Sequence, residues 1–277
     1  MKWVRVTRQH RCPVCQHPDW CSVSEDGLVT HCMRVESDRP CRSAKVGGWF
    51  HGLSDPVRYV PPKRKQEPVA EKDFPDLACR YEQQLQDIDL LAKSLGVSVR
   101  SLERLQVGWN GQGHTFPMRD GCERVIGIRV RGAKGKWCVP GSHNGLFWPE
   151  GVYCGSDYPL LIAEGPTDTA SLLGMGFHAI GRSSCSGGVD HVIEFLKGRR
   201  REVVIMADKD PPKTRPDGSV WYPGQEGAAR LAQAIRPFCR TIKIIKPPFC
   251  KDVRAWRIAG ATREVVQAVI KNTRFIP

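Results

Sequence analysis

Residues 160–168 read LLIAEGPTD and residues 203–210 read VVIMADKD, and these two stretches decide the fold of the chain. Each is a short apolar run that ends in carboxylates. Near-continuous apolar runs are typical of buried parallel strands, and ligands of open α/β sheets bind outside the carboxyl ends of those strands. We therefore expect Glu164, Asp208 and Asp210 to meet at one edge of one sheet. Asp208 and Asp210 are two residues apart, so in an extended chain their side chains point the same way.

A cluster of carboxylate oxygens is the donor set of a Mg²⁺ or Mn²⁺ site, of the kind used to handle phosphates. An Asp-x-Asp alone is a weak signal, since solvated aspartates at strand ends are common. The surrounding pattern alternates between strands and helices, which predicts βαβ crossovers and a mostly parallel sheet covered by helices. The expected strands are 159–165, 177–182, 202–208 and 240–248, and the expected helices are 167–175, 189–197, 225–238, 253–260 and 262–272.

The 277-residue chain carries a formal net charge of +13, and much of the excess lies in residues 100–136. That balance is typical of a protein that binds a polyanion, most simply nucleic acid. The alternative interpretation is a solvated basic surface. No stretch approaches the roughly 20 apolar residues of a membrane span, and the N-terminus has no apolar signal region. We therefore expect a cytoplasmic protein with no membrane partner.

The sequence contains 12 cysteines, four of them crowded near the N-terminus. Cys12 and Cys15 form a Cys-x-x-Cys knuckle, and Cys21 and Cys32 flank an expected hairpin turn at Asp26-Gly27. Four thiolates of this kind make a closed zinc site that lets a short segment fold without a large core. Spacing alone leaves three other side chains open as the third or fourth zinc ligand: His17, His31 and Cys41.

We expect four regions along the chain. Residues 1–53 form the cysteine-rich module, and 54–76 form a linker rich in proline and lysine. Residues 77–157 form a basic α+β subdomain with helical spacing over 77–105, interrupted at Gly96, and short strands from Thr115 to Phe147. Residues 158–277 form the α/β region. The expected fold is therefore mixed, α+β and α/β, with an N-terminal zinc ribbon.

The joint pattern of LLIAEGPTD, VVIMADKD and the helical GQEGAARLAQAI resembles the Toprim domain of bacterial-type primases, topoisomerases and certain nucleases. In that family a strand-terminal Glu and an Asp-x-Asp bind divalent metal, which implies this role for Glu164, Asp208 and Asp210. EGPTD is similar to the EGYMD-type motif of the primases, which adds Asp168. KDVRAW resembles a Lys-Asp segment of the primases, which adds Asp252 as a metal ligand and Lys251 as a nucleotide contact.

The resemblance extends upstream. FPMRDGCERVIGIRVRG followed by KWCVPGSHNGLF resembles the basic subdomain that precedes Toprim in DnaG-type primases. It implies phosphate contacts from four basic residues: Arg119, Arg129, Arg131 and Lys136. The cysteine module resembles the primase zinc ribbon, with one departure, because the position of the family's last ligand is Val35 here. Cys21 on the facing strand is the best replacement, so the expected zinc ligands are Cys12, Cys15, Cys21 and Cys32.

The resemblance implies a DNA primase that synthesises short RNA primers from NTPs on single-stranded DNA by metal-dependent nucleotidyl transfer. Glu164 would be either a metal ligand or a general base near the primer 3′-hydroxyl. The chain has no GxxxxGK[ST], so we expect no helicase motor within it and a replicative helicase acting in trans. The zinc module would read template on Trp20, Trp49 or Phe50, unless these form its core. The alternatives are a non-catalytic DNA-binding or regulatory Toprim protein and a Toprim nuclease.

Overall fold

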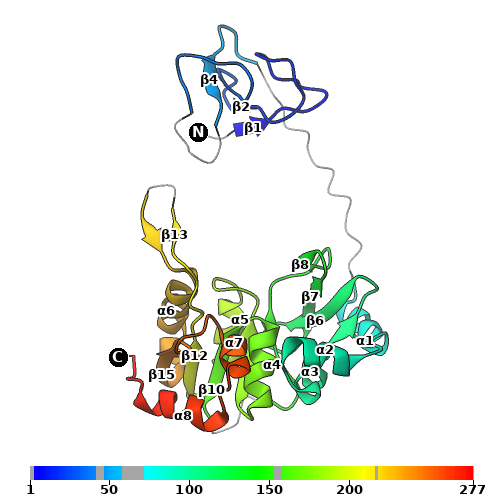
Figure 1. Cartoon of the computed structure of the whole chain (residues 1–277), viewed down its shortest axis with the longest axis vertical. Coiled ribbons are helices and arrows are strands. Elements are labelled where there is room, and N and C mark those ends of the chain that lie inside the picture. The colour runs from blue at the N-terminus through cyan, green and yellow to red at the C-terminus, as the bar shows by residue number, and fades with distance from the viewer. Residues whose placement is uncertain (1–2, 42–46, 58–71, 153–157, 216–217, 277) are drawn as a thin grey trace. The chain divides into compact units, whose positions relative to one another are not determined.

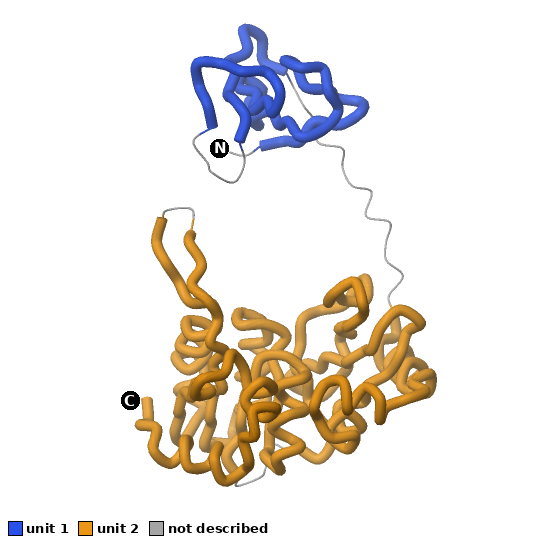
Figure 2. The backbone as a smooth tube through the Cα atoms, viewed as in Figure 1, with its two compact units in different colours: residues 1–68 blue, residues 69–277 orange. Residues whose placement is uncertain are grey.

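The computed structural model describes residues 3–41, 47–57, 72–152, 158–215 and 218–276. The chain divides into two compact units, residues 1–68 and residues 69–277 (Figure 2). Most of the predicted linker, residues 58–71 of the range 54–76, lies outside the described residues. Among the described residues, no helix is long and apolar enough to cross a membrane.

Unit 1 is a small four-stranded antiparallel sheet in the order β1-β2-β3-β4. Its strands are Trp3–Arg5 (β1), Ser22–Ser24 (β2), Val29–Cys32 (β3) and Trp49–Gly52 (β4). The expected hairpin turn at Asp26-Gly27 joins β2 to β3, and Gly27 has the positive φ of +74° that a tight turn requires. Val57 N–H donates to the carbonyl of Gly27 at 3.0 Å, so the module continues past its predicted end at residue 53.

Unit 2 begins with three helices: Phe74–Gln83 (α1), Ile88–Leu95 (α2) and Val99–Arg104 (α3). Helix α1 starts inside the range 54–76 that we predicted as linker, because the Asp73 carboxylate caps it by accepting from Asp76 N–H at 3.0 Å. The predicted helical stretch breaks at Asp87 as well as at Gly96, since Asp87 caps α2. Gly96 ends α2 with a left-handed φ of +68°.

A nine-stranded sheet forms the centre of unit 2 (Figure 1). Its order is β15-β12-β10-β11-β9-β6-β7-β8, with β5 paired to β6. The strands from the first half of the unit are Gly108–Trp109 (β5), Gly113–Arg119 (β6), Val125–Gly132 (β7), Gly135–Cys138 (β8) and Leu146–Phe147 (β9). The strands from the second half are Leu160–Glu164 (β10), His178–Arg182 (β11), Arg201–Met206 (β12) and Cys239–Ile245 (β15).

The second half has the predicted alternation of strands and helices. Strands β10, β11, β12 and β15 are parallel, and the interior of β10 is buried on both faces, as its apolar run indicated. The helices are Pro166–Gly174 (α4), Val189–Leu196 (α5), Pro223–Ile235 (α6), Val253–Ile258 (α7) and Arg263–Asn272 (α8), with a 3₁₀ turn at Arg236–Phe238. This part of the fold prediction is confirmed.

The two halves of unit 2 share this single sheet, although we predicted them as separate regions meeting at residue 157. The short strand β9 joins them, because it pairs antiparallel with β11 on one side and with β6 on the other. Leu146 and Phe147 are fully buried there. Strand β9 consequently fixes the position of the antiparallel strands β6, β7 and β8 relative to the parallel strands.

A two-stranded arm, Lys213–Thr214 (β13) and Val220–Trp221 (β14), follows Asp210 and projects from the sheet (Figure 1). Glu226 of α6 holds both sides of the arm: it accepts from the guanidinium of Arg215, which follows β13, at 2.7 Å, and from the N–H of Tyr222, which follows β14, at 3.1 Å. Gly224 completes the attachment, since a Cβ there would come within 2.5 Å of the Asp208 carbonyl oxygen.

Candidate active site and metal centres

Three acidic side chains stand where two central strands end. Glu164 is the last residue of β10, and Asp208 and Asp210 follow directly after β12. The two strands are parallel neighbours, with Leu160 opposite Val203. Their carboxyl ends consequently lie at the same edge of the sheet, as the sequence predicted.

Two helices add further carboxylates at this edge. Asp168 lies in the first turn of α4 and is buried, and its Oδ1 accepts from Arg254 N–H at 2.8 Å. Asp252 caps α7, where its Oδ1 accepts from Ala255 N–H at 2.7 Å. Both interactions fix the side chains through backbone groups of α7, so the position of α7 determines where these two carboxylates lie.

All five acidic residues line one pocket of about 380 Å³, which we call the acidic pocket. Basic residues from the antiparallel half of the sheet and from α7 form its other wall. The full lining is Phe116, Arg129, Arg131, Lys136, Phe147, Glu164, Gly165, Pro166, Thr167, Asp168, Ser183, Asp208, Asp210, Lys251, Asp252 and Arg254.

The basic wall contains four of the five basic residues predicted to contact nucleic acid or nucleotide. Arg129, Arg131 and Lys136 come from β7 and β8, and Lys251 Nζ lies 3.8 Å from Asp210 Oδ1. The structure does not bring Arg119 to this pocket. Its guanidinium instead donates to the Glu123 carbonyl at 2.7 Å and to the side chain of Gln106.

Three carboxylates of the acidic pocket, those of Glu164, Asp168 and Asp208, have raised pKa values. Burial first, and then Asp168 and the other carboxylates around it, raises the pKa of Asp208 to about 8. Burial and then Asp252 raise the pKa of Asp168 to about 7, and burial followed by Asp210 raises the pKa of Glu164. A site with this excess of negative charge is suited to a divalent cation, which would favour the ionised carboxylates.

Among the described residues, only a group of four cysteines brings three or more potential metal-ligating side chains within 4.8 Å of one another. The carboxylates line the acidic pocket at wider spacing. That spacing fits Mg²⁺, which keeps several waters and is bound by one or two carboxylates together with substrate phosphates. The donor set therefore fits Mg²⁺ or Mn²⁺ with several of its waters retained.

The sequence reasoning missed two arginines of this region. Arg254 lines the acidic pocket and donates from Nη1 to the Leu95 carbonyl at 3.2 Å, which links α7 to α2. Arg182 is buried at the end of β11, directly opposite Glu164, and donates to the Cys185 carbonyl at 2.6 Å. The signal for Arg182 was a charged residue ending an apolar strand, the same signal that identified Glu164.

The loop 183–188, which follows β11, makes hydrogen bonds to two residues of the acidic pocket. Ser183 accepts on its carbonyl from Arg129 Nη2 at 3.1 Å, and Cys185 N–H donates to the Glu164 carboxylate. The loop therefore connects Glu164 to the basic wall of the acidic pocket.

In unit 1, the four cysteines predicted as zinc ligands come together. Cys15 Sγ lies 3.6 Å from Cys21 Sγ, and Cys21 Sγ lies 4.0 Å from Cys32 Sγ. Backbone N–H groups face the sulfurs, with Met33 N–H 3.4 Å from Cys21 Sγ and Val35 N–H 3.4 Å from Cys32 Sγ. Four thiolates with backbone N–H donors around them form the donor set of a closed structural zinc site.

The alternative zinc ligands lie outside this group. His31 Nε2 contacts the Gly47 carbonyl at 2.7 Å, and its ring lies 4.9 Å from that of Phe50. Phe50 also contacts Trp3, so it belongs to the small aromatic cluster of the module. Trp20 differs, because 75% of its surface is exposed and its backbone has a left-handed φ of +64°.

No protein-family model and no curated protein matches this sequence. Solved structures do match it. The DnaG primase catalytic domain bound to ssDNA has a TM-score of 0.57 at 16% identity, covering 73% of this chain and 78% of that one. The E. coli primase catalytic core has a TM-score of 0.54 at 18% identity, covering 73% and 79%. The chain has the fold of the DnaG catalytic core.

A further match is the Aquifex aeolicus primase, solved with its zinc-binding and RNA polymerase domains, at a TM-score of 0.55 and 13% identity. It covers 73% of this chain and 60% of that chain. At these identities the likeness establishes the DnaG-type fold, and any function must be argued from the residues of this chain.

Proposed function

We propose that this chain is a DNA primase that joins ribonucleotides into short primers on single-stranded DNA. One observation supports this most strongly: carboxylates from β10, β12, α4 and α7 face a basic wall across one pocket, at the carboxyl edge of a DnaG-type sheet. Phosphoryl transfer requires neutralised phosphates and an aligned hydroxyl, and this pocket offers groups for both.

The positions of the acidic residues in the pocket support a division of roles among them. We propose that Asp208, Asp210 and Asp252 hold Mg²⁺ or Mn²⁺, with Asp168 supporting them from α4. The bound ion would neutralise phosphate charge and lower the pKa of the attacking hydroxyl. Glu164 serves as a further ligand or as the base near the primer 3′-hydroxyl; its raised pKa, caused by burial and Asp210, suits a proton acceptor.

The basic residues would bind the anionic substrates. Lys251 lies beside Asp210 and is exposed, which suits contact with the triphosphate of an incoming NTP. Arg129, Arg131 and Lys136 extend from the pocket along β7 and β8, which suits the backbone of a template strand. We propose that the zinc module, with Zn²⁺ on its four cysteines, contacts single-stranded template through the exposed Trp20. A helicase acting in trans stays a prediction.

The test uses the full chain with single-stranded DNA, labelled NTPs and Mg²⁺ or Mn²⁺, and separates the products on a gel. New oligoribonucleotides are the result expected of a primase. Shortened DNA would instead identify a nuclease, and a shifted band without product would identify a DNA-binding protein. Either of those outcomes would overturn the proposal.

Two variants assign the activity to the acidic pocket. Asp210→Asn should abolish primer synthesis, because it removes a charge that faces Lys251 and the proposed cation. Glu202→Gln is the matched control: it lies on β12, the strand that leads to Asp210, but its carboxylate pairs with Arg240 at 3.3 Å outside the pocket. Equal primer synthesis by both variants would refute the assignment.

A further inference from the structure

A row of directly paired residues crosses the antiparallel half of the sheet. Trp109 on β5 is paired with His114 on β6, His114 with Arg131 on β7, and Arg131 with Lys136 on β8. Directly opposed residues of antiparallel strands present their side chains on the same face. Arg131 and Lys136 line the acidic pocket, so the row leads from that pocket to Trp109.

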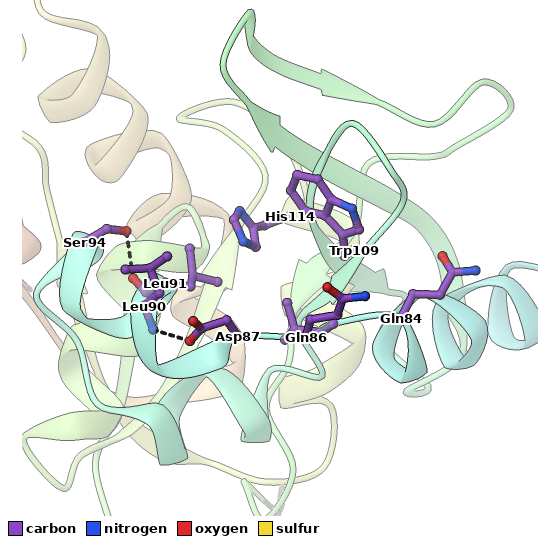
Figure 3. Close-up of a pocket in the computed structure, with 9 residues that line it drawn as sticks. Gln84, Gln86, Asp87, Leu90, Leu91, Ser94, Trp109 and His114 are labelled. Carbon is purple, nitrogen blue, oxygen red and sulfur yellow. Dashed lines mark hydrogen bonds between the residues drawn. The ribbon is translucent and has the colours of Figure 1, made fainter.

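The far end of the row opens into a second pocket, which we call the tryptophan pocket (Figure 3). Its volume is about 470 Å³. The rings of Trp109 and His114 meet edge to face at one wall, with centroids 4.9 Å apart, and Leu90, Leu91 and Ser94 of helix α2 face them. The full lining is Gln84, Leu85, Gln86, Asp87, Leu90, Leu91, Ser94, Trp109 and His114.

The chemistry of this pocket is apolar and aromatic with a rim of uncharged hydrogen-bonding groups. Asp87 is the only acidic residue of the lining, and its carboxylate is already engaged as the N-cap of α2, accepting from Leu90 N–H at 2.8 Å. Burial, and then the nearby Arg131, lowers the pKa of His114, so its imidazole is neutral at physiological pH. Leu90 lies on the rim with 65% of its surface exposed.

We propose that the tryptophan pocket binds an unpaired base of single-stranded nucleic acid whose phosphates run over Arg131 and Lys136 toward the acidic pocket. The inference extends the proposed primase function by adding a base-binding position on the template path. Charge complementarity favours this occupant, because the apolar aromatic pocket is separated by His114 alone from the cations Arg131 and Lys136 in the same row. A planar base stacks on an indole, while the adjacent cations hold its phosphates.

The spacing agrees with such a strand. Paired strands are about 4.8 Å apart, so Trp109 and Arg131, two strands apart, are separated by roughly 10 Å. Stacked nucleotides advance by about 3.4 Å each, so this separation corresponds to about three nucleotides. The base in the tryptophan pocket would therefore lie a few nucleotides away from the one at the acidic pocket.

The test compares binding of the full chain to an oligothymidylate and to an abasic oligomer with the same number of phosphates. Stacking on one aromatic side chain corresponds to roughly 5- to 100-fold in affinity. The measured quantity is the ratio of the affinity for oligothymidylate to the affinity for the abasic oligomer. We expect this ratio to be smaller by about this factor in Trp109→Ala than in the wild type. Trp109→Phe should restore most of the base dependence, while Tyr158→Ala, which removes an exposed aromatic elsewhere, should leave it unchanged.

A second measurement on the wild type is independent of any variant. Photo-crosslinking with an oligonucleotide that carries 5-iodouracil should label Trp109 or His114. Unchanged base dependence in a folded Trp109→Ala variant, or crosslinks that all lie outside the tryptophan pocket, would overturn the proposal and assign the pocket to another occupant, such as an apolar side chain of a protein. Primer synthesis, measured on the same preparation, tests the proposed function separately from base binding.

Discussion

Replacing Asp208 with asparagine should stabilise the protein at neutral and alkaline pH when no divalent cation is present. The pKa of Asp208 is about 8 in the folded protein, against about 3.9 for an aspartate in an unfolded chain. Between these values the folded state binds more protons than the unfolded state, so the free energy of unfolding falls as pH rises. The destabilisation is absent below about pH 4 and complete above about pH 8, and asparagine removes it.

The size of the effect follows from the width of that interval. Each pKa unit corresponds to about 1.4 kcal/mol, so a single group titrating alone would lose roughly 5 kcal/mol between pH 4 and pH 8. The titration of Asp208 is coupled to that of Asp168 and Glu164, whose negative charges contribute to its raised pKa. The value for a group titrating alone is therefore an upper limit. We expect Asp208→Asn to gain at least about 1 kcal/mol at pH 8 and nothing at pH 4.

Urea denaturation at both pH values, followed by circular dichroism, measures the difference. Asp120→Asn is a control of opposite sign, because Asp120 accepts from the N–H groups of Cys122 and Arg124 at 2.9 Å each and its pKa is lowered. Its loss should destabilise the protein at neutral pH. A destabilised Asp208→Asn variant, or a gain that is the same at both pH values, would refute this reasoning.

Three further outcomes are expected. Cys21→Ser should lose zinc by elemental analysis and unfold unit 1, while Cys41→Ser keeps its zinc; full zinc in both variants would contradict the four-cysteine site. Arg131→Gln should flatten the slope of log affinity for single-stranded DNA against log salt by roughly 0.7, while Arg119→Gln should leave the slope unchanged. Phe147→Ala should lower the free energy of unfolding by about 3–5 kcal/mol, measured by urea denaturation, because this fully buried ring lies where the two halves of the sheet join.

The carboxylates at the sheet edge could be predicted because apolar runs such as that of β10 end abruptly in acidic residues, and parallel strands put those ends together. The cysteine group could be predicted only in part: the Cys-x-x-Cys knuckle indicated a metal site, but spacing left His17, His31 and Cys41 open, and the resemblance to the primase zinc ribbon led to the choice of Cys21. Helix boundaries were harder to predict from the sequence. The capping residues Asp73 and Asp87 are polar residues in a polar stretch, so the start of α1 and the break before α2 went unrecognised.

Long-range pairing was the part that no local pattern indicated. Strand β9 consists of Leu146 and Phe147 alone, too short for any periodicity, yet it merges two predicted regions into one sheet. The tryptophan pocket depends in the same way on the pairing of Trp109 with His114, which a two-residue strand at β5 does not reveal. Arg119 was predicted from the sequence to contact phosphates, but its side chain on β6 contacts Gln106 and Glu123 instead of lining the acidic pocket.

The arm formed by β13 and β14 can change in length without moving the acidic pocket. Glu226 ties down Arg215 and the N–H of Tyr222, and Gly224 packs directly on the backbone of Asp208. Because Glu226 and Gly224 hold the arm, residues added next to Ser219 would not move the acidic pocket. Each doubling of the length of a loop destabilises a fold by only about 0.6 kcal/mol. The arm is therefore a position where evolution, or a protein engineer, can insert a new segment close to the acidic pocket without moving its carboxylates.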